Sequence, residues 1–192
     1  MDKSARKEQL AEAVWQVILD RSISAVSIRT VAEQAELVVG SLRHVFPTRA
    51  ELLTFSAELM VQRATARVLA TPPKGDPLEY VLDVIKRLLP LDPDSRAELE
   101  VNLALFAEGA AMPELVAIRD AAHRELANVC VRLVELLTNA PRGTSATADT
   151  RRLHALVDGL AFHLLHLPLD EDPTWAIDIV RQELARMRGC AQ

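Results

Sequence analysis

The side chains best suited to contact another molecule lie between residues 27 and 49, where small and basic residues are interspersed with apolar ones. Arg43 carries a planar guanidinium that can form two parallel hydrogen bonds with one guanine, or pair with a phosphate. His44, the next residue, can donate a hydrogen bond to a phosphate oxygen. Gly40 lacks a side chain, so its backbone can approach a duplex closely. These residue types favour a surface that contacts DNA.

Two short helices and the start of a third are expected to position these side chains. Ser27 is a good N-cap for the first helix, because its hydroxyl can accept a hydrogen bond from a free N–H of the first turn. The second helix is expected over residues 39–45, and Pro47 ends it because proline disfavours helical geometry in the preceding residue. Thr48 can cap the next helix, with Glu51 at the capping-box position. Two short helices this close together form a shape that can enter a major groove.

Residues at the helix starts are expected to hold phosphates, and the second helix is expected to read base edges. The alternative interpretation is that Arg43 and His44 only form a solvated face. Leu42, Val45 and Phe46 are expected to be core. The predicted DNA-contacting residues are Ser27, Arg29, Thr30, Val39, Gly40, Ser41, Arg43, His44, Thr48 and Arg49.

This stretch resembles the helix-turn-helix of TetR-family transcriptional repressors. The resemblance covers about the first quarter of the chain, and the segment 157–160 (Val-Asp-Gly-Leu) is similar to one C-terminal subgroup of the family. It implies a DNA-binding head, a helical body that dimerises on a palindromic operator, and a small effector that releases the DNA. The matches that carry it are Gly40-Ser41-Leu42, Arg43-His44, Phe46, Thr48, Arg49 and Glu51-Leu52.

The sequence departs from the family pattern at the turn and in the second helix. Glu36 stands where the family usually has Gly, and a left-handed backbone there would cost ~1 kcal/mol. Val38 stands where a Ser would cap the second helix, and losing such a cap typically costs ~1 kcal/mol. Arg43 and Val45 replace aromatic residues. An alternative function is therefore a ligand sensor or protein-interaction module whose DNA-binding head has decayed.

Composition favours an all-α fold. Of the 192 residues 49% are hydrophobic and 26% charged, six are Gly, and no alternating apolar–polar run appears. The net charge is −5, but residues 1–50 hold seven Lys/Arg and six Asp/Glu, giving +1 against −6 for the rest. We expect a three-helix helix-turn-helix head over residues 1–47. A TetR-like ligand-binding and dimerisation bundle of about six helices is expected over residues 48–192.

Apolar periodicity and Pro, Asp and Gly positions set the expected helix boundaries. A flexible loop rich in Gly, Ser, Thr and Pro is expected over residues 139–148. Asp-Pro pairs at residues 92–93 and 172–173 are expected to open two helices, because Asp is a good cap and Pro suits the first helical position. The expected helices outside the helix-turn-helix are 4–20, 48–69, 78–89, one opening at 93, one opening at 113, 149–167 and 173–188.

Two surfaces of the body are expected to carry function. The last two helices are expected to form the dimer interface, because small residues there allow close approach and Phe162 is an apolar anchor; ordinary core packing is the alternative. An effector pocket should be mostly apolar with a few orienting polar groups. The interface residues are Ala155, Gly159, Phe162, His166, Trp175 and Ile179; the pocket residues are Tyr80, Val84, Asn102, Phe106, Arg119, His123 and His163.

Other function classes have weaker support. An enzyme would need a base such as His163 or His154 with Asp158 as partner, yet no nucleophile elbow, P-loop, dinucleotide fingerprint or zinc motif is present, so no catalytic residue, metal or cofactor is expected. Cys130 and Cys190 lack metal-ligand spacing and fit a reducing cytosol. No apolar stretch is long enough for a membrane span, so a soluble, cytoplasmic protein is expected.

Overall fold

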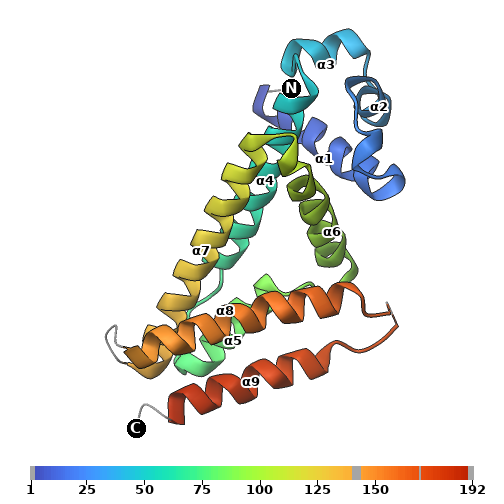
Figure 1. Ribbon diagram of the computed structural model, residues 1–192. Coiled ribbons are helices and arrows are strands. Elements are labelled where there is room, and N and C mark those ends of the chain that lie inside the picture. The colour runs from blue at the N-terminus through green and yellow to red at the C-terminus, as the bar shows by residue number, and fades with distance from the viewer. Residues whose placement is uncertain (1–2, 140–143, 169, 190–192) are drawn as a thin grey trace. The chain divides into compact units, whose positions relative to one another are not determined.

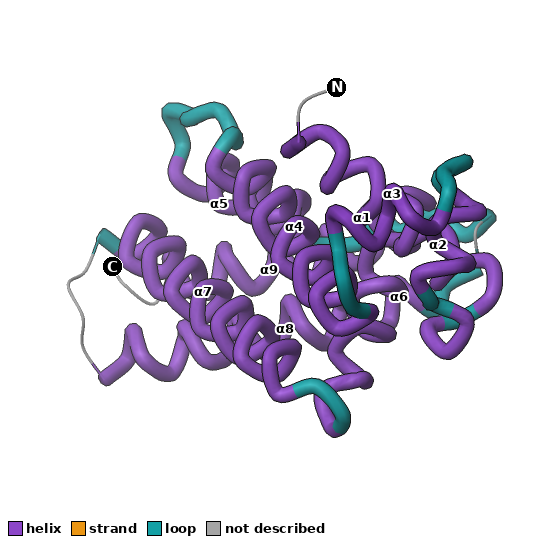
Figure 2. Tube along the Cα trace, turned by 90° about the horizontal axis from the view of Figure 1, so that it is seen from above, coloured by secondary structure: helices purple, strands orange, loops and turns teal. Residues whose placement is uncertain are grey.

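The computed structural model describes residues 3–139, 144–168 and 170–189, and all regular structure in these ranges is helical (Figures 1 and 2). The expected all-α fold is confirmed. Cys190 and residues 140–143 of the expected loop at 139–148 lie outside the described residues, and the prediction of a loop over 144–148 is wrong because these residues belong to a helix. The helices are α1 (Lys3–Arg21), η1 (Ile23–Ala25), α2 (Ile28–Gln34), α3 (Val39–Val45), α4 (Arg49–Leu69), α5 (Pro77–Leu88), α6 (Pro93–Ala107), η2 (Glu108–Ala110), α7 (Pro113–Thr138), α8 (Thr144–Leu165) and α9 (Thr174–Gly189).

The chain packs into two compact units, each with its own apolar core. The first comprises Met1–Arg63 and Ala97–Asp120, and the second comprises Ala64–Arg96 and Ala121–Gln192. These units are defined by how the chain packs, whereas the expected domains 1–47 and 48–192 are defined by function. The division into a DNA-binding domain and a ligand-binding and dimerisation domain therefore stays a prediction. The largest fully buried side chains are Leu10, Leu42, Leu52, Leu53, Leu105 and Leu115 in the first unit, and Leu82, Ile85, Leu153, Leu164, Leu184 and Met187 in the second.

Aspartates before prolines open three helices of the body. The Asp76 carboxylate accepts a hydrogen bond from the Leu78 N–H at 3.2 Å, and Pro77 begins α5. The Asp92 carboxylate accepts from the Ser95 N–H at 2.8 Å. The Asp172 carboxylate accepts from the Thr174 N–H at 2.9 Å, and hydrogen bonds from Thr174 lower the pKa of this carboxyl. The predicted opening at 92–93 is confirmed, and α9 begins at Thr174, one residue after the predicted start at Pro173.

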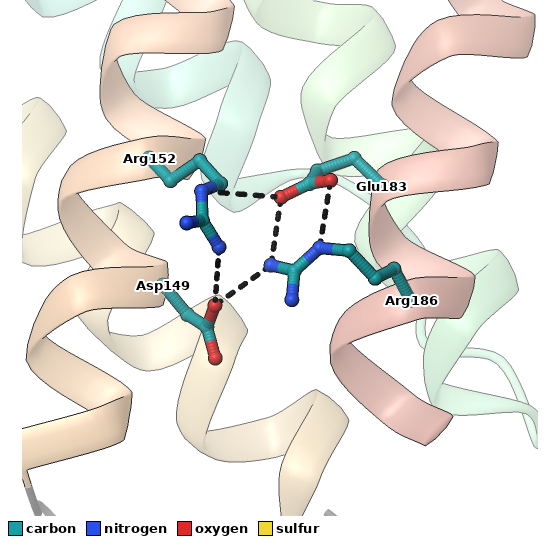
Figure 3. Close-up of polar contacts among 4 residues, drawn as sticks. All are labelled: Asp149, Arg152, Glu183 and Arg186. Atoms are coloured by element: carbon teal, nitrogen blue, oxygen red, sulfur yellow. Dashed lines mark hydrogen bonds and ion pairs between the residues drawn. The ribbon is translucent and has the colours of Figure 1, made fainter. Parts of the chain in front are cut away.

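The predicted start of α8 at residue 149 is wrong, because the helix begins at Thr144. The carboxylate of Asp149 is buried and pairs with α9 instead of capping its own helix (Figure 3). Arg186 lies 2.8 Å from both Asp149 and Glu183, and hydrogen bonds to these two carboxylates raise the pKa of its guanidinium. Arg152 reaches the same two carboxylates at 3.4 and 4.0 Å. This network ties α8 to α9.

Candidate nucleic-acid interface

The start of α2 is fixed by a reciprocal capping box. The Ser27 hydroxyl accepts from the Thr30 N–H at 3.1 Å, and the Ser27 N–H donates to the Thr30 hydroxyl oxygen at 2.9 Å. The Thr30 hydroxyl lies 2.7 Å from the Ala25 carbonyl oxygen, to which it can donate. The predicted N-cap is confirmed. Thr30 therefore holds the helix start, and its single hydroxyl proton has an acceptor inside the head.

The turn between α2 and α3 contains the strained position that the sequence indicated. Glu36 has φ 54°, in the left-handed region. The Leu37 N–H donates to the Ala32 carbonyl at 2.8 Å and the Glu36 N–H to the Glu33 carbonyl at 3.1 Å, which together form a Schellman motif. Gly is the usual residue at this position of the motif, so Glu36 costs stability where the family pattern would not. Val38 makes no side-chain cap, as expected.

Helix α3 has one buried and one exposed face. Leu42 is fully buried and Phe46, just after the helix, is 3% exposed, so both anchor the helix on the core of the first unit. Arg43, His44 and Gly40 are exposed. A Cβ built at Gly40 would meet nothing within 4 Å, so no neighbour in the described protein requires glycine there. Arg29 and Thr48 are also exposed, whereas Val39 and Ser41 are half-buried.

The start of α4 combines the predicted cap with an internal role for Arg49. The Thr48 hydroxyl accepts from the Glu51 N–H at 3.1 Å and lies 3.1 Å from the Glu51 carboxylate. The Arg49 guanidinium donates to the Val26 carbonyl at 2.8 Å and to the Ile23 carbonyl at 3.1 Å.

Arg49 also pairs with Glu108 at 3.1 Å. No local sequence pattern indicates this clamp, because its acceptors are two backbone carbonyls and one carboxylate from a distant segment. A phosphate contact by Arg49 stays a prediction, and it would compete with these bonds.

The flank of the first unit beside α3 is a mixed, acidic-rimmed hollow of about 350 Å³. The Lys7 ammonium lies 5.4 Å from the Phe46 ring centroid and 5.2 Å from that of Phe55, so it is held by cation–π contact. Glu51, Glu58 and Glu114 also line the hollow. These carboxylates disfavour a phosphate in the hollow.

The expected interface residues of α8 and of the turn that follows it are all exposed in the single chain: Ala155, Gly159 and Phe162 on the helix, and His166 just after it. Phe162 is 59% exposed, and its ring lies 4.7 Å from that of His166. On α9, which packs beside α8, Ile179 is 39% exposed and Trp175 is half-buried (Figure 1). Large apolar side chains therefore lie at the surface where a partner is expected.

The expected pocket residues divide between the two units. In the first unit Asn102 and Phe106 are half-buried, whereas Arg119 is exposed and pairs with Asp120 at 2.9 Å. The Asn102 amide oxygen is buried and has no hydrogen-bond partner in the part of the chain that the structure describes. The residues of the second unit are Tyr80, half-buried, Val84, buried in the core, and the exposed His123 and His163.

The chain is similar to several known transcriptional regulators. A model of the C-terminal part of BetI-type transcriptional repressors matches residues 77–189. The HTH-type transcriptional regulator PksA of Bacillus subtilis (strain 168) is 32% identical over 173 residues, which are 88% of this chain and 83% of PksA. A transcriptional regulator from Rhodococcus sp. RHA1 matches with TM-score 0.81 and 25% identity over 96% of both chains. A protein from Saccharomonospora viridis, solved in complex with choline, has the same fold, with TM-score 0.76 at 22% identity over 95% of both chains.

No helix within the described ranges is long and apolar enough to cross a membrane. The matched relatives are transcriptional regulators, so the interpretation of His154 or His163 as a catalytic base is not supported. Because the BetI-type model matches more than half of the chain and the similarity to PksA spans most of it, the chain belongs to the TetR family of DNA-binding transcriptional regulators, which are not enzymes.

Proposed function

We propose that the protein is a homodimeric repressor whose two α3 helices read a palindromic operator and which a small, largely apolar effector releases. The observation that carries the proposal is the exposed face of α3, with Gly40, Arg43 and His44 above the buried Leu42. Arg43 reads a guanine or holds a phosphate, while His44, Ser41 and Val39 contact the neighbouring groove and backbone. Arg29 and Thr48, exposed at the starts of α2 and α4, hold flanking phosphates together with Ser27.

The proposed dimer uses the exposed stripe of α8 and its neighbour on α9. Phe162 and Ile179 are large apolar side chains that are 59% and 39% exposed, and burial of apolar surface is worth about 25 cal/mol per Å². Exposed Ala155 and Gly159 allow a partner helix to approach closely. A two-fold axis here would serve half-sites ~34–36 Å apart.

The proposed effector contacts Asn102 and Phe106 in the first unit. An amide oxygen that is buried without a donor is costly unless a guest supplies one. An effector with a hydroxyl, amine or amide N–H on an otherwise apolar body would satisfy it. The S. viridis protein of the same fold, solved with choline, supports a small guest in such a body.

The operator proposal is tested by fluorescence anisotropy over a series of salt concentrations. The two duplexes compared are the DNA upstream of the gene that encodes this protein and a random duplex of equal length. Specific binding exceeds non-specific binding by about 10³-fold or more in typical repressors, and both weaken as salt rises. Equal affinity for the two duplexes at every salt concentration would contradict the proposal.

A decayed head remains a second candidate, because Glu36 is held at φ 54° and Val38 provides no cap. In that case the protein senses a ligand or binds another protein without DNA. The Arg43→Ala variant distinguishes the two candidate functions. A DNA-binding repressor should lose operator affinity, whereas a protein with a decayed head should show no operator affinity in either form.

The effector proposal has its own test. Native mass spectrometry of freshly purified protein is expected to show a small organic molecule carried on the wild-type chain and lost from Asn102→Leu. Equal retention by both proteins would place the guest elsewhere.

A further inference from the structure

Two helices of the second unit bring two imidazoles and a carboxylate together at its surface. His123 lies on α7, and His154 and Asp158 lie one turn apart on α8. One ligand atom of each side chain lies within 4.8 Å of the other two. We propose that these three residues form a binding site for a divalent late transition-metal ion, such as Zn²⁺, Co²⁺ or Ni²⁺.

The donor set has the chemistry of such ions. Imidazole nitrogen suits Zn²⁺, Ni²⁺ and Cu²⁺, and two imidazoles with one carboxylate form a known three-ligand zinc set. At metal–ligand distances of ~2.0–2.2 Å, donor atoms of one tetrahedral ion lie ~3.3–3.5 Å apart. The present separations therefore require only a small inward adjustment of side chains, two of which are exposed: His123 and Asp158.

His154 supplies an observation that is independent of the cluster's composition. Its Nε2 atom is buried and has no hydrogen-bond partner among the described residues. The nearest Asp158 carboxylate oxygen is 3.5 Å away. The His154 side chain is 13% exposed and the Asp158 side chain is 54% exposed. A buried imidazole nitrogen without a partner loses its hydration and gains nothing in return. A metal ion on Nε2 would remove that cost.

The arrangement of the two rings also fits a shared ion. The His123 and His154 ring centroids are 4.7 Å apart, with the planes tilted by 35°. The spacing of His154 and Asp158 places both on one face of α8, as in helical metal motifs whose ligands are four residues apart. His123 closes the site from the other helix. Three protein ligands leave a fourth position open for water or for a donor atom of another molecule.

A bound ion would join α7 to α8 and stabilise the folded state by binding it preferentially. The site does not depend on DNA binding or on an effector, so its test stands apart from the proposed repressor function. The sequence does not indicate this site, because the ligands come from separate helices and form no local zinc motif.

The test is a Co²⁺ titration of chelator-treated, untagged full-length protein, followed by visible absorption and by competition with Zn²⁺. One Co²⁺ per chain with visible d–d bands, displaced by Zn²⁺, is expected. His123→Ala and Asp158→Asn should each weaken binding at least about tenfold, since even outer-shell substitutions at metal sites cost that much. His163→Ala, which removes an exposed histidine of α8, and His166→Ala, which removes one just after that helix, should leave binding unchanged.

Circular dichroism verifies that each variant is folded, and His154→Ala is used as a third ligand variant only if its spectrum matches wild type. The melting temperature should rise with Zn²⁺ in wild type and in the two controls, but not in the ligand variants. Absence of stoichiometric Co²⁺ binding by wild type would overturn the proposal. Equal losses in the ligand variants and the His166→Ala control would overturn it as well.

Discussion

At the scale of single residues, Gly40 is expected to be needed for close approach to DNA but not for the stability of the protein. No described neighbour lies within 4 Å of a Cβ added there, and its backbone is helical. Gly40→Ala should therefore stabilise the head by up to ~1 kcal/mol, the difference between the two residues in a helix. On the exposed face of α3, the methyl group of the new alanine should keep the helix backbone away from the duplex. Operator affinity should therefore fall.

Thermal melting and anisotropy measure these two effects of Gly40→Ala separately. Gly75→Ala is the matched control, because Gly75 also has open space around it but lies in a loop of the second unit. It should leave operator affinity unchanged. A Gly40→Ala variant with wild-type affinity would show that the backbone of α3 does not approach DNA closely.

Arg43 is the residue expected to carry sequence preference. Arg43→Ala should cost about 1–3 kcal/mol of operator affinity and relax preference at one base pair, if the side chain reads a guanine. If Arg43 contacts only a phosphate, Arg43→Ala should weaken binding equally for all DNA sequences. The affinity of the variant should also depend less steeply on salt concentration. Anisotropy with a set of single-base operator variants distinguishes these outcomes. Arg124→Ala, which removes an exposed arginine of α7, is the charge-matched control.

Cys130 is a buried thiol whose protonation makes it unreactive. Burial first, and then the nearby negative charge of Asp158, raises the pKa of this thiol to about 12. Alkylation requires the thiolate, so Cys130 should stay unlabelled by iodoacetamide in native protein at pH 8 and react fully in denaturant. The stability that the protonated thiol provides is complete below its ordinary pKa near 9 and is lost as pH rises towards 12. Peptide mapping by mass spectrometry checks the labelling; rapid native labelling at pH 8 would mean that the site is open.

At the scale of elements, the end of α2 stores strain at Glu36. The Schellman motif requires a left-handed residue there, and Glu36 adopts φ 54°. Glu36→Gly should raise the free energy of unfolding by ~1 kcal/mol. Glu33→Gly, in the helical part of the same element, should lower it by a similar amount. Chemical denaturation measures both, and a destabilised Glu36→Gly would mean that the carboxylate makes a compensating contact.

Elements differ in how far their sequences determine them. The openings of α2, α6 and α9 were predictable because each capping side chain is bound within its own first turn. The start of α8 was not, because the Asp149 carboxylate that looks like a cap is used by Arg186 of another helix.

The same distinction applies to the sites. The exposed face of α3 could be predicted, because helical periodicity alone separates Arg43 and His44 from Leu42. The clamp of Arg49 and the cluster around His154 depend on groups brought together only by tertiary packing. Local patterns carry no information about such partners.

At the scale of the whole molecule, binding of a palindromic operator requires two chains. Phe162→Glu should shift the protein from dimer to monomer in light scattering after gel filtration, because a charge cannot be buried unpaired in an apolar interface. Operator affinity should fall with it, since one head alone has few phosphate contacts. Leu69→Glu changes another strongly exposed apolar side chain, outside the expected interface, and should remain dimeric. A dimeric Phe162→Glu variant would place the interface elsewhere.

The central claim is that two α3 helices read successive grooves of one operator. Hydroxyl-radical footprinting of the chain's own upstream DNA tests it most directly. We expect two protected patches on one face of the duplex, ~34–36 Å apart or a multiple of one helical turn, related by an inverted repeat and lost with Arg43→Ala. A single unrepeated patch, or no protection beyond that of random DNA, would contradict the account.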